Sequence, residues 1–184
     1  EVDAIVEVVR AFEDADIPHV TWHINPAQVI DPINTVLILA DLTTGEKAVS
    51  HLEKEAKAGG AKIKKQLEAA KEILSLLAAG TPASAYEPPH EEAMQTLQEM
   101  QMLTAKPFLY VFNVTDIDAC AMLGFAQFVQ SRALHSLCLN IKLEDELAQM
   151  GEDAGELAKE SHLDELIKKA YAVLGLITFL TTGE

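Results

Sequence analysis

The sequence is poor in cysteine, in aromatic residues and in long apolar runs, and each shortage excludes something. Only two cysteines, Cys120 and Cys138, occur in 184 residues. Such a pair gives no sign of a redox site, and in a cytosolic chain we expect two reduced, buried thiols. No stretch reaches the roughly 18 consecutive apolar residues that a membrane-spanning helix needs. The first residues lack the basic start and the cleavage site of a signal peptide, so we expect a cytoplasmic protein without a membrane partner.

Basic residues are scarce as well. The chain has 14 Lys and Arg against 29 Asp and Glu, a net charge of −15, which argues against a surface that coats nucleic acid or an anionic membrane. The charge is segregated, however. The stretch from Lys47 to Lys71 holds seven lysines and three glutamates and so carries +4, which leaves −19 on the remainder. We therefore expect any contact with a polyanion in that stretch, without DNA specificity.

What the chain does have is apolar sequence of the aliphatic kind, with 49% apolar residues of which few are aromatic. Three runs predict buried strands: 3–12 (DAIVEVVRAF), 108–113 (FLYVFN) and 133–140 (ALHSLCLN). A helix fits between the second and third runs, and helical spacing returns after the third, in 162–176. This order predicts an α/β fold with a parallel sheet. We expect the first strand to be covered on both faces.

The connection between the first two predicted strands is several times longer than the dozen or so residues that a crossover needs. Within it, apolar residues recur by fours and threes in two runs, which is the spacing of coiled-coil seams. Gly59 and Gly60 lie between the runs, where a chain reversal needs permissive backbone. The pattern predicts an inserted antiparallel α-helical coiled-coil hairpin with arms of about 20 residues. The alternative is two surface helices packed on the main core. The seam residues are Ile38, Leu42, Gly45, Val49, Leu52 and Ala56, then Ile63, Leu67, Ala70, Leu74 and Leu77.

The second predicted strand stops at Asn113, and the carboxylate of Asp116 follows three residues later. In open α/β sheets, ligands bind just beyond the carboxyl ends of the strands. A carboxylate accepts two hydrogen bonds side by side, which suits the two parallel donors on the N1 and N2 edge of guanine. The alternative is a structural role, in which Thr115 or Asp116 caps the next helix.

Four ordered stretches carry a resemblance that covers nearly the whole chain: 1–20 (EVDAIVEVVRAFEDADIPHV), 31–42 (DPINTVLILADL), 103–114 (LTAKPFLYVFNV) and 163–184 (LDELIKKAYAVLGLITFLTTGE). They look like consecutive landmarks of the Obg-like ATPase (YchF) family of P-loop NTPases. The resemblance implies a partial G domain in 1–32 and 81–176. It also implies the family's coiled-coil insertion in 33–80, and in 177–184 the start of the strand that leads to a TGS domain.

The resemblance also implies a site for a purine nucleotide, ATP or GTP. The family's Asn-x-x-Glu base-recognition motif falls on 113–116, and its second nucleotide loop, Ser-Ala-Lys in many members, falls on 140–142. Asp116 stands in place of Glu, as in guanine-reading GTPases, which leaves the base preference open. Asn140 replaces the usual small residue, and we expect its larger side chain to alter the pocket wall. The expected nucleotide-binding residues are Asn113, Val114, Asp116, Asn140, Ile141 and Lys142.

One part of an NTPase is missing from the sequence. Nothing matches G-x-x-x-x-G-K-[ST], and no Asp-x-x-Gly segment is present for a metal and γ-phosphate. Phosphoryl transfer depends on positioning and electrostatic stabilisation around the phosphates. We therefore expect no nucleotide hydrolysis by this chain alone, and no ligands in it for the Mg²⁺ of the intact family protein.

The basic stretch supplies the second functional hypothesis. Five lysines cluster around the predicted hairpin tip, where the phosphates of RNA could be contacted while the acidic body stays away. The resemblance favours the ribosome as partner. The alternatives are a solvated lysine-rich coiled-coil end, or a non-catalytic module that binds RNA or a protein. The residues are Lys54, Lys57, Lys62, Lys64 and Lys65.

Other constellations of reactive residues are weak. His19 and His23 could share a metal ion, but no cysteine or carboxylate lies at ligand spacing. Glu144 and Glu146 resemble a catalytic pair, although acids near a helix start more often complement its dipole. We expect no metal site and assign no catalytic residue in this chain.

Overall fold

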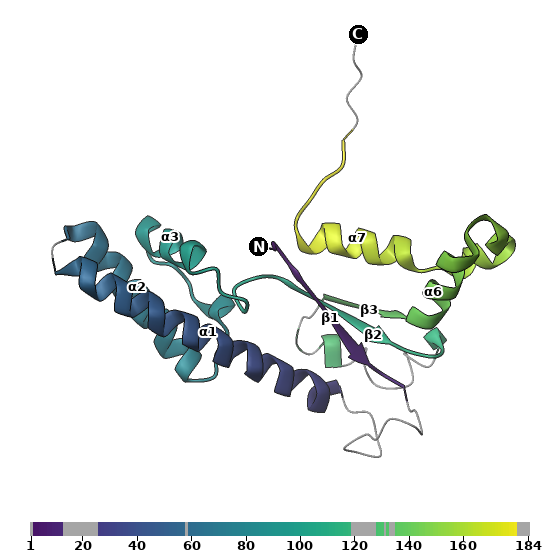
Figure 1. Cartoon of the computed structure of the whole chain (residues 1–184), viewed down its shortest axis with the longest axis horizontal. Coiled ribbons are helices and arrows are strands. Elements are labelled where there is room, and N and C mark those ends of the chain that lie inside the picture. The colour runs from purple at the N-terminus through teal and green to yellow at the C-terminus, as the bar shows by residue number, and fades with distance from the viewer. Residues whose placement is uncertain are drawn as a thin grey trace, which may run out of the picture. The chain divides into compact units, whose positions relative to one another are not determined.

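The structure is a computed structural model of the whole chain, and it describes residues 2–12, 26–57, 59–118, 128–130, 132 and 135–179. These residues form two compact units (Figure 1). One consists of Glu1–Val29 with Pro107–Glu184, and the other of Ile30–Lys106. Within the described residues, no helix is long and apolar enough to cross a membrane.

The first unit is built on a parallel sheet. Its strands are β1 (Ile5–Arg10), β2 (Phe108–Asn113) and β3 (His135–Leu139), in the order β1-β2-β3. Arg10 pairs with Asn113, and Asn113 pairs with Leu139, so the three strands end together at one edge. The predicted α/β fold with a parallel sheet is confirmed.

Helix α7 (Leu163–Val173) packs across β2 and β3 (Figure 1). Its Leu166, Ala170 and Val173 cover a cluster formed by buried residues of the two strands. On the β3 side, Lys169 Nζ donates to the backbone oxygen of Ser136 at 2.6 Å. Two further elements, α6 (Ile141–Met150) and the 3₁₀ segment η2 (Gly151–Glu160), lie between β3 and α7 in the chain.

Strand β1 differs from its prediction. Glu7 and Val9 are buried, whereas Val6 and Val8 are 49% and 55% exposed. Side chains alternate between the two faces of a strand, so one face of β1 is covered and the other is largely open. The prediction of a strand covered on both faces is therefore wrong.

Two predictions fall on the segment between β2 and β3. The helix predicted there lies mostly on residues outside those that the structure describes, and so does Cys120.

Cys138, in β3, is a disulfide cysteine. The expectation of a reduced thiol is wrong for Cys138.

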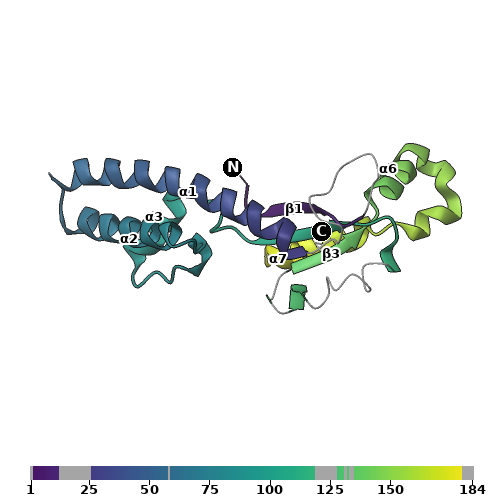
Figure 2. The same ribbon diagram turned by 90° about the horizontal axis from the view of Figure 1, so that it is seen from below.

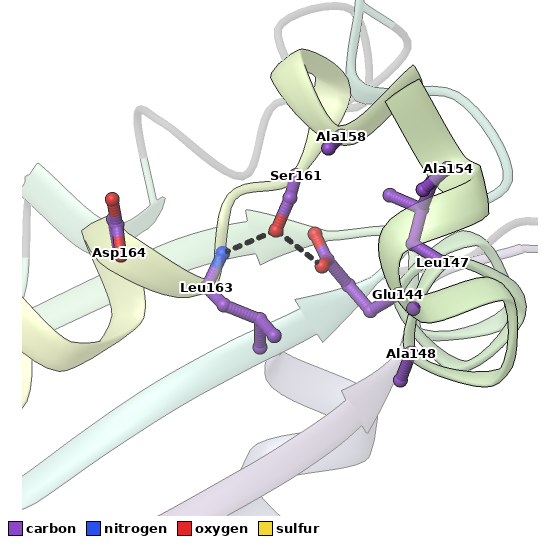
Figure 3. Close-up of a pocket in the computed structure, with 9 residues that line it drawn as sticks. Glu144, Leu147, Ala148, Ala154, Ala158, Ser161, Leu163 and Asp164 are labelled. Atoms are coloured by element: carbon purple, nitrogen blue, oxygen red, sulfur yellow. Dashed lines mark hydrogen bonds between the residues drawn. The ribbon is translucent and has the colours of Figure 1, made fainter. Parts of the chain in front are cut away.

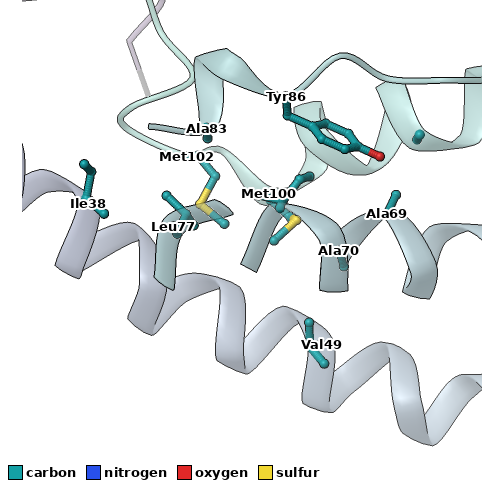
Figure 4. Close-up of a cluster of buried hydrophobic side chains, with 11 residues drawn as sticks. Ile38, Val49, Ala69, Ala70, Leu77, Ala83, Tyr86, Met100 and Met102 are labelled. Carbon is teal, nitrogen blue, oxygen red and sulfur yellow. The ribbon is translucent and has the colours of Figure 1, made fainter. Parts of the chain in front are cut away.

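The second unit contains α1 (Pro26–Ala56, of which Ile30 onward belongs to this unit), α2 (Ala61–Ala78), a short 3₁₀ turn η1 (Ala83–Ala85) and α3 (Glu91–Met100). Helices α1 and α2 run side by side in both views (Figures 1 and 2). Eight of the predicted seam residues belong to the core of this unit, which Figure 4 shows in part. They are Ile38, Leu42, Val49, Leu52, Leu67, Ala70, Leu74 and Leu77.

This unit is larger than the predicted hairpin of 33–80. Helix α2 also buries Gln66, Ala69 and Ile73, which a two-helix seam does not account for. Helix α3 packs on α2, and Met100 and Met102 enter the same core. The segment after residue 80 therefore packs with the helices.

A buried carboxylate, Asp41, joins helix α1 to the segments on either side of α3. Asp41 is 2% exposed and accepts hydrogen bonds from the backbone nitrogens of Leu103 and Thr104, both at 2.7 Å, and from Thr104 Oγ1 at 2.6 Å. Thr104 Oγ1 in turn accepts from the backbone nitrogen of Ala83 at 2.9 Å. A buried carboxylate needs such partners, and this one joins α1 to the two segments that flank α3.

Candidate functional site

The candidate site lies at the carboxyl edge of the sheet, where two asparagines follow adjacent strands. Asn113 is the last residue of β2, and Asn140 comes directly after β3. Because Asn113 pairs in register with Leu139, the loops that leave the two strands start side by side. The structure thus brings together the two segments that the sequence predicted to share a site.

Three hydrogen bonds join the two loops. The backbone nitrogen of Val114 donates to the oxygen of Leu139 at 3.0 Å. The backbone nitrogen of Ile141 donates to Asn113 Oδ1 at 3.2 Å. In the opposite direction, Asn140 Nδ2 donates to the backbone oxygen of Thr115 at 2.9 Å. Each asparagine therefore bonds to the backbone of the other loop. Val114 is buried, so its side chain packs in the core.

Asp116 is exposed at the end of the first loop. Its Oδ1 accepts a hydrogen bond from the backbone nitrogen of Asp118 at 2.9 Å, so the capping alternative holds for this oxygen. Among the described residues, Oδ2 has no hydrogen-bond partner. Asp116 combines a local backbone contact with one carboxylate oxygen that can accept bonds from a ligand.

The second loop begins helix α6. Asn140 Oδ1 accepts from the backbone nitrogen of Leu143 at 3.1 Å and caps the helix. Lys142 follows in the first turn, and its side chain is 87% exposed. Its Nζ lies 3.8 Å from Glu146 Oε1, a loose contact on the surface, so the Lys142 amine is accessible to a ligand.

Glu144 is a structural carboxylate in this arrangement. It is 7% exposed, and its Oε2 accepts from Ser161 Oγ at 2.7 Å (Figure 3). Its Oε1 accepts from the backbone nitrogen of His162 at 2.7 Å. It thereby connects α6 to the start of α7 and borders a pocket of about 330 Å³. Because Glu146 is exposed and pairs with Lys142, Glu144 and Glu146 do not form a catalytic pair.

The predicted RNA-binding lysines lie at the end of α1 and the start of α2, on either side of the 57–60 connection. Lys65 Nζ contacts Glu92 Oε1 at 3.0 Å. The other four are exposed and form no ion pair within 4 Å among the described residues. The first turn of α2 has no acidic residue, so Lys62 and Lys64 have no acidic neighbour in that turn, whereas Lys57 interacts electrostatically with Glu53 of α1. The four are Lys54, Lys57, Lys62 and Lys64.

Sequence reasoning missed Glu7. This residue lies in β1 and is 8% exposed, and neither of its carboxylate oxygens has a hydrogen-bond partner within the part of the chain that the structure describes. Burial raises the pKa of Glu7 to about 7, because a charged carboxylate is poorly solvated there. The only signal in the sequence was a single acidic residue inside an apolar run.

Metal ligands do not gather in the part of the chain that the structure describes, where no group of three or more His, Cys, Asp or Glu side chains could hold an ion. His19 and His23 lie outside the described residues. The candidate site therefore consists of backbone and amide groups, one carboxylate and one amine.

Comparison with known proteins identifies relatives over the full chain, although no protein-family model matches it. The ribosome-binding ATPase YchF of Bacillus subtilis is 32% identical, over 100% of this chain and 53% of that protein. Obg-like ATPase 1 of Saccharomyces cerevisiae is 31% identical, over 99% of this chain and 50% of that protein.

A solved structure agrees with these relatives. The YchF GTPase of Schizosaccharomyces pombe superimposes with a TM-score of 0.77 at 26% identity, over 99% of this chain and 53% of that one. The resemblance seen in the sequence is thus confirmed by alignment and by fold. The chain is similar over its whole length to the Obg-like ATPase (YchF) proteins, and it spans about half the length of the relatives that it matches.

Proposed function

We propose that this chain is the base-recognition portion of an Obg-like nucleotide-binding protein that acts in the cytoplasm. The observation that carries the proposal is the paired-loop edge of the sheet. There Asn113 and Asn140 hold two loops together, and Asp116 presents an accessible carboxylate oxygen. The names of the relatives, ATPase and GTPase, support a nucleotide as ligand.

The chemistry of Asp116 favours guanine over adenine. An ionised carboxylate is only an acceptor, and the N1 and N2 groups of guanine are both donors. Adenine places an acceptor, N1, beside its N6 donor, so a carboxylate would face a lone pair. In this proposal Asn113 braces the loops, Lys142 flanks the base, and the nucleotide is GTP rather than ATP.

The phosphates would be bound elsewhere. The sequence has no G-x-x-x-x-G-K-[ST] loop, and the described residues do not fit Mg²⁺, since no ligand group gathers. In this proposal the chain performs no hydrolytic step by itself. Base contacts alone give weak binding, with a Kd of roughly 1 mM.

Titration of GTP and ATP into the 184-residue chain, followed by NMR chemical shifts, tests this proposal. GTP should shift the amides of 113–118 and 140–142, and ATP should bind more weakly. Asp116→Ala should lower GTP affinity at least tenfold, because a hydrogen bond to a charged group contributes about 1.5–3 kcal/mol. Asp118→Ala removes an exposed carboxylate two residues away and should leave affinity unchanged. Equal losses in both variants would contradict base reading by Asp116.

We further propose that α1 and α2 form an antiparallel coiled-coil arm whose basic end contacts ribosomal RNA. The supporting observation is the set of four lysines that form no ion pair with any described residue, on a chain of net charge −15. The relative from Bacillus subtilis is named as ribosome-binding. A non-catalytic module that binds RNA or a protein through this arm remains the second candidate function.

A matched pair of charge reversals tests the arm. Lys62→Glu with Lys64→Glu changes the tip, and Lys159→Glu with Lys168→Glu makes the same charge change on the sheet unit. The tip pair should weaken binding to ribosomes more than tenfold. It should also reduce the slope of log K against log salt concentration by about 0.7 for each lost RNA phosphate contact. If the two pairs weaken binding equally, the arm does not provide the contact.

A further inference from the structure

Asn140 has a hydrogen-bond partner at both ends of its side-chain amide. Its Oδ1 accepts from the backbone nitrogen of Leu143 at 3.1 Å, inside α6. Its Nδ2 donates to the backbone oxygen of Thr115 at 2.9 Å, in the loop that follows β2. The same side chain thus caps one element and holds a second that lies 25 positions earlier in the chain.

Capping alone does not require asparagine. A cap needs only an oxygen that accepts from the first turn of the helix, and Ser, Thr or Asp supplies one about as well. The feature that asparagine adds at this position is the Nδ2 donor, and the structure uses this donor on Thr115. The bond between the loops therefore distinguishes Asn140 from an ordinary cap.

This bond acts next to the base-reading carboxylate. The carbonyl of Thr115 belongs to the peptide group that enters Asp116, so fixing this oxygen limits rotation of the peptide plane before Asp116. The preceding residues are already held, Asn113 by Ile141 and Val114 by Leu139. Asn140 adds the last link between the loops before Asp116, whose Oδ1 then bonds forward to Asp118.

We propose that Asn140 is a positioning residue for purine recognition. Its amide ties the Thr115 carbonyl to the N-terminus of α6 and holds Asp116 in the geometry that meets a guanine base before the nucleotide arrives. Both polar atoms of Asn140 have partners in the protein, so it acts through Asp116 and not by reading the base. This inference rests on the proposed nucleotide function and adds the residue that sets its selectivity.

Two substitutions separate the bond between the loops from the cap. Asn140→Ser keeps a neutral capping oxygen, but its side chain is too short to reach Thr115. Asn140→Ala loses both contacts. Hydrogen exchange should be faster in both variants at the amide of Asp118, which donates to Asp116 Oδ1. Protection within α6 should fall only in Asn140→Ala, and the serine variant should match the wild type there.

Nucleotide binding supplies the readout that a purely structural role would not change. GTP and ITP differ at the N2 amino group, which ITP lacks, so the ratio of their affinities reports the alignment of Asp116. Asn140→Ser should weaken GTP binding about three- to tenfold, the range expected for one hydrogen bond. It should also bring the GTP-to-ITP ratio toward one. A cap defect would lower both affinities equally.

The outcomes are distinct. Wild-type affinity, ratio and amide exchange in Asn140→Ser overturn the positioning role and leave the nucleotide proposal standing. A wild-type chain that binds neither GTP nor ITP overturns the proposed function, and the selectivity role of Asn140 with it. Faster exchange at Asp118 together with a reduced ratio supports the inference.

Discussion

At the scale of single residues, the role of a polar side chain depends on which of its atoms already has a partner. At the carboxyl edge, Asn113 Oδ1 and both polar atoms of Asn140 bond to backbone groups. One oxygen of Asp116 bonds to Asp118, and the other can accept bonds from a ligand. The same reasoning applied to Glu7 gives a different result, because both of its oxygens are buried and neither bonds to any described residue.

Glu7 should make the stability of the protein fall as the pH rises toward neutrality. Its pKa is about 7 in the folded protein, against 4.5 for the unperturbed group. Below pH 4.5 the carboxyl group is protonated in both the folded and the unfolded state, so it does not change the stability with pH. Between pH 4.5 and 7 the carboxyl group ionises only in the unfolded state. Above pH 7 the free energy of unfolding is therefore about 3 kcal/mol smaller than at low pH. Stability attributable to Glu7 is therefore lost over this window.

Glu7→Gln should remove this pH dependence. We expect the variant to be more stable than the wild type at pH 8 by about 1–3 kcal/mol, and nearly equal to it at pH 4.5, in urea denaturation at several pH values. Glu152→Gln, at an exposed position, is the matched control and should follow the wild-type profile. Parallel profiles for Glu7→Gln and the wild type would show that Glu7 is not the responsible group.

The sequence predicted residue roles where a role follows from position in an element. Asn113 and Asp116 were chosen as candidates because Asn113 ends a buried run, which predicts a position at the ligand edge of the sheet for both. The bond from Asn140 to Thr115 could not be foreseen. Its acceptor is a backbone carbonyl, which leaves no mark in the sequence, and the sequence suggested only that Asn140 would alter a pocket wall. Glu7 was missed because one acidic residue does not change a strand pattern.

At the scale of elements, the heptad pattern predicted that two helices are present, but it did not predict all the elements that pack against them. The seam residues of α1 and α2 do enter a common core. The spacing of the seam residues predicts one partner for each helix. Helix α2 has a second partner in α3, and its Ala69 and Ile73, which lie outside the predicted seam, are buried as well. The three strands were found because buried parallel strands are continuous apolar runs, but the open face of β1 depends on neighbours that its own residues do not encode.

Gly45 shows how closely the helices of the second unit approach one another. A Cβ atom added at this position would lie 2.9 Å from Leu74 Cδ1, 3.4 Å from Met102 Cε and 3.7 Å from Met100 Cε. All three neighbours are ends of flexible side chains, so a methyl group fits after a small shift. Glycine inside a helix costs about 1 kcal/mol relative to alanine.

Gly45→Ala should therefore stabilise the protein by about 0.5 kcal/mol, whereas Gly45→Leu should overpack the core and destabilise it by about 1–3 kcal/mol. Thermal unfolding followed by circular dichroism measures both changes. A matched substitution at Gly60, where an added Cβ meets nothing within 4 Å, reports the effect of size without crowding. Leucine tolerated equally at both positions would contradict the close approach.

At the scale of the whole molecule, the chain consists of two units with separate cores. The sheet unit buries β2 and β3 under α7, and the helical unit has its own cluster of residues from 38 to 102. The sequence indicated this division through a strand-to-strand connection too long for a crossover. It placed the end of the insertion at residue 80, whereas the helical unit continues to Lys106. The reason lies in α3, whose sequence reads as an ordinary amphipathic helix and does not reveal which core it joins.

The helical unit should fold as an isolated fragment, Ile30–Lys106. Its apolar cluster is contained within these bounds, and so is the Asp41, Thr104 and Ala83 network that joins its two ends. A buried carboxylate is stable only with its partners in place, and all three donors to Asp41 lie inside the fragment. We expect a helical circular dichroism spectrum and a cooperative thermal transition.

A shorter fragment that ends at residue 80, where the sequence placed the boundary, lacks Thr104, Met100 and Met102 and should unfold at a lower temperature or without cooperativity. Equal stability of the two fragments would mean that α3 and the segment after it are not part of this folding unit.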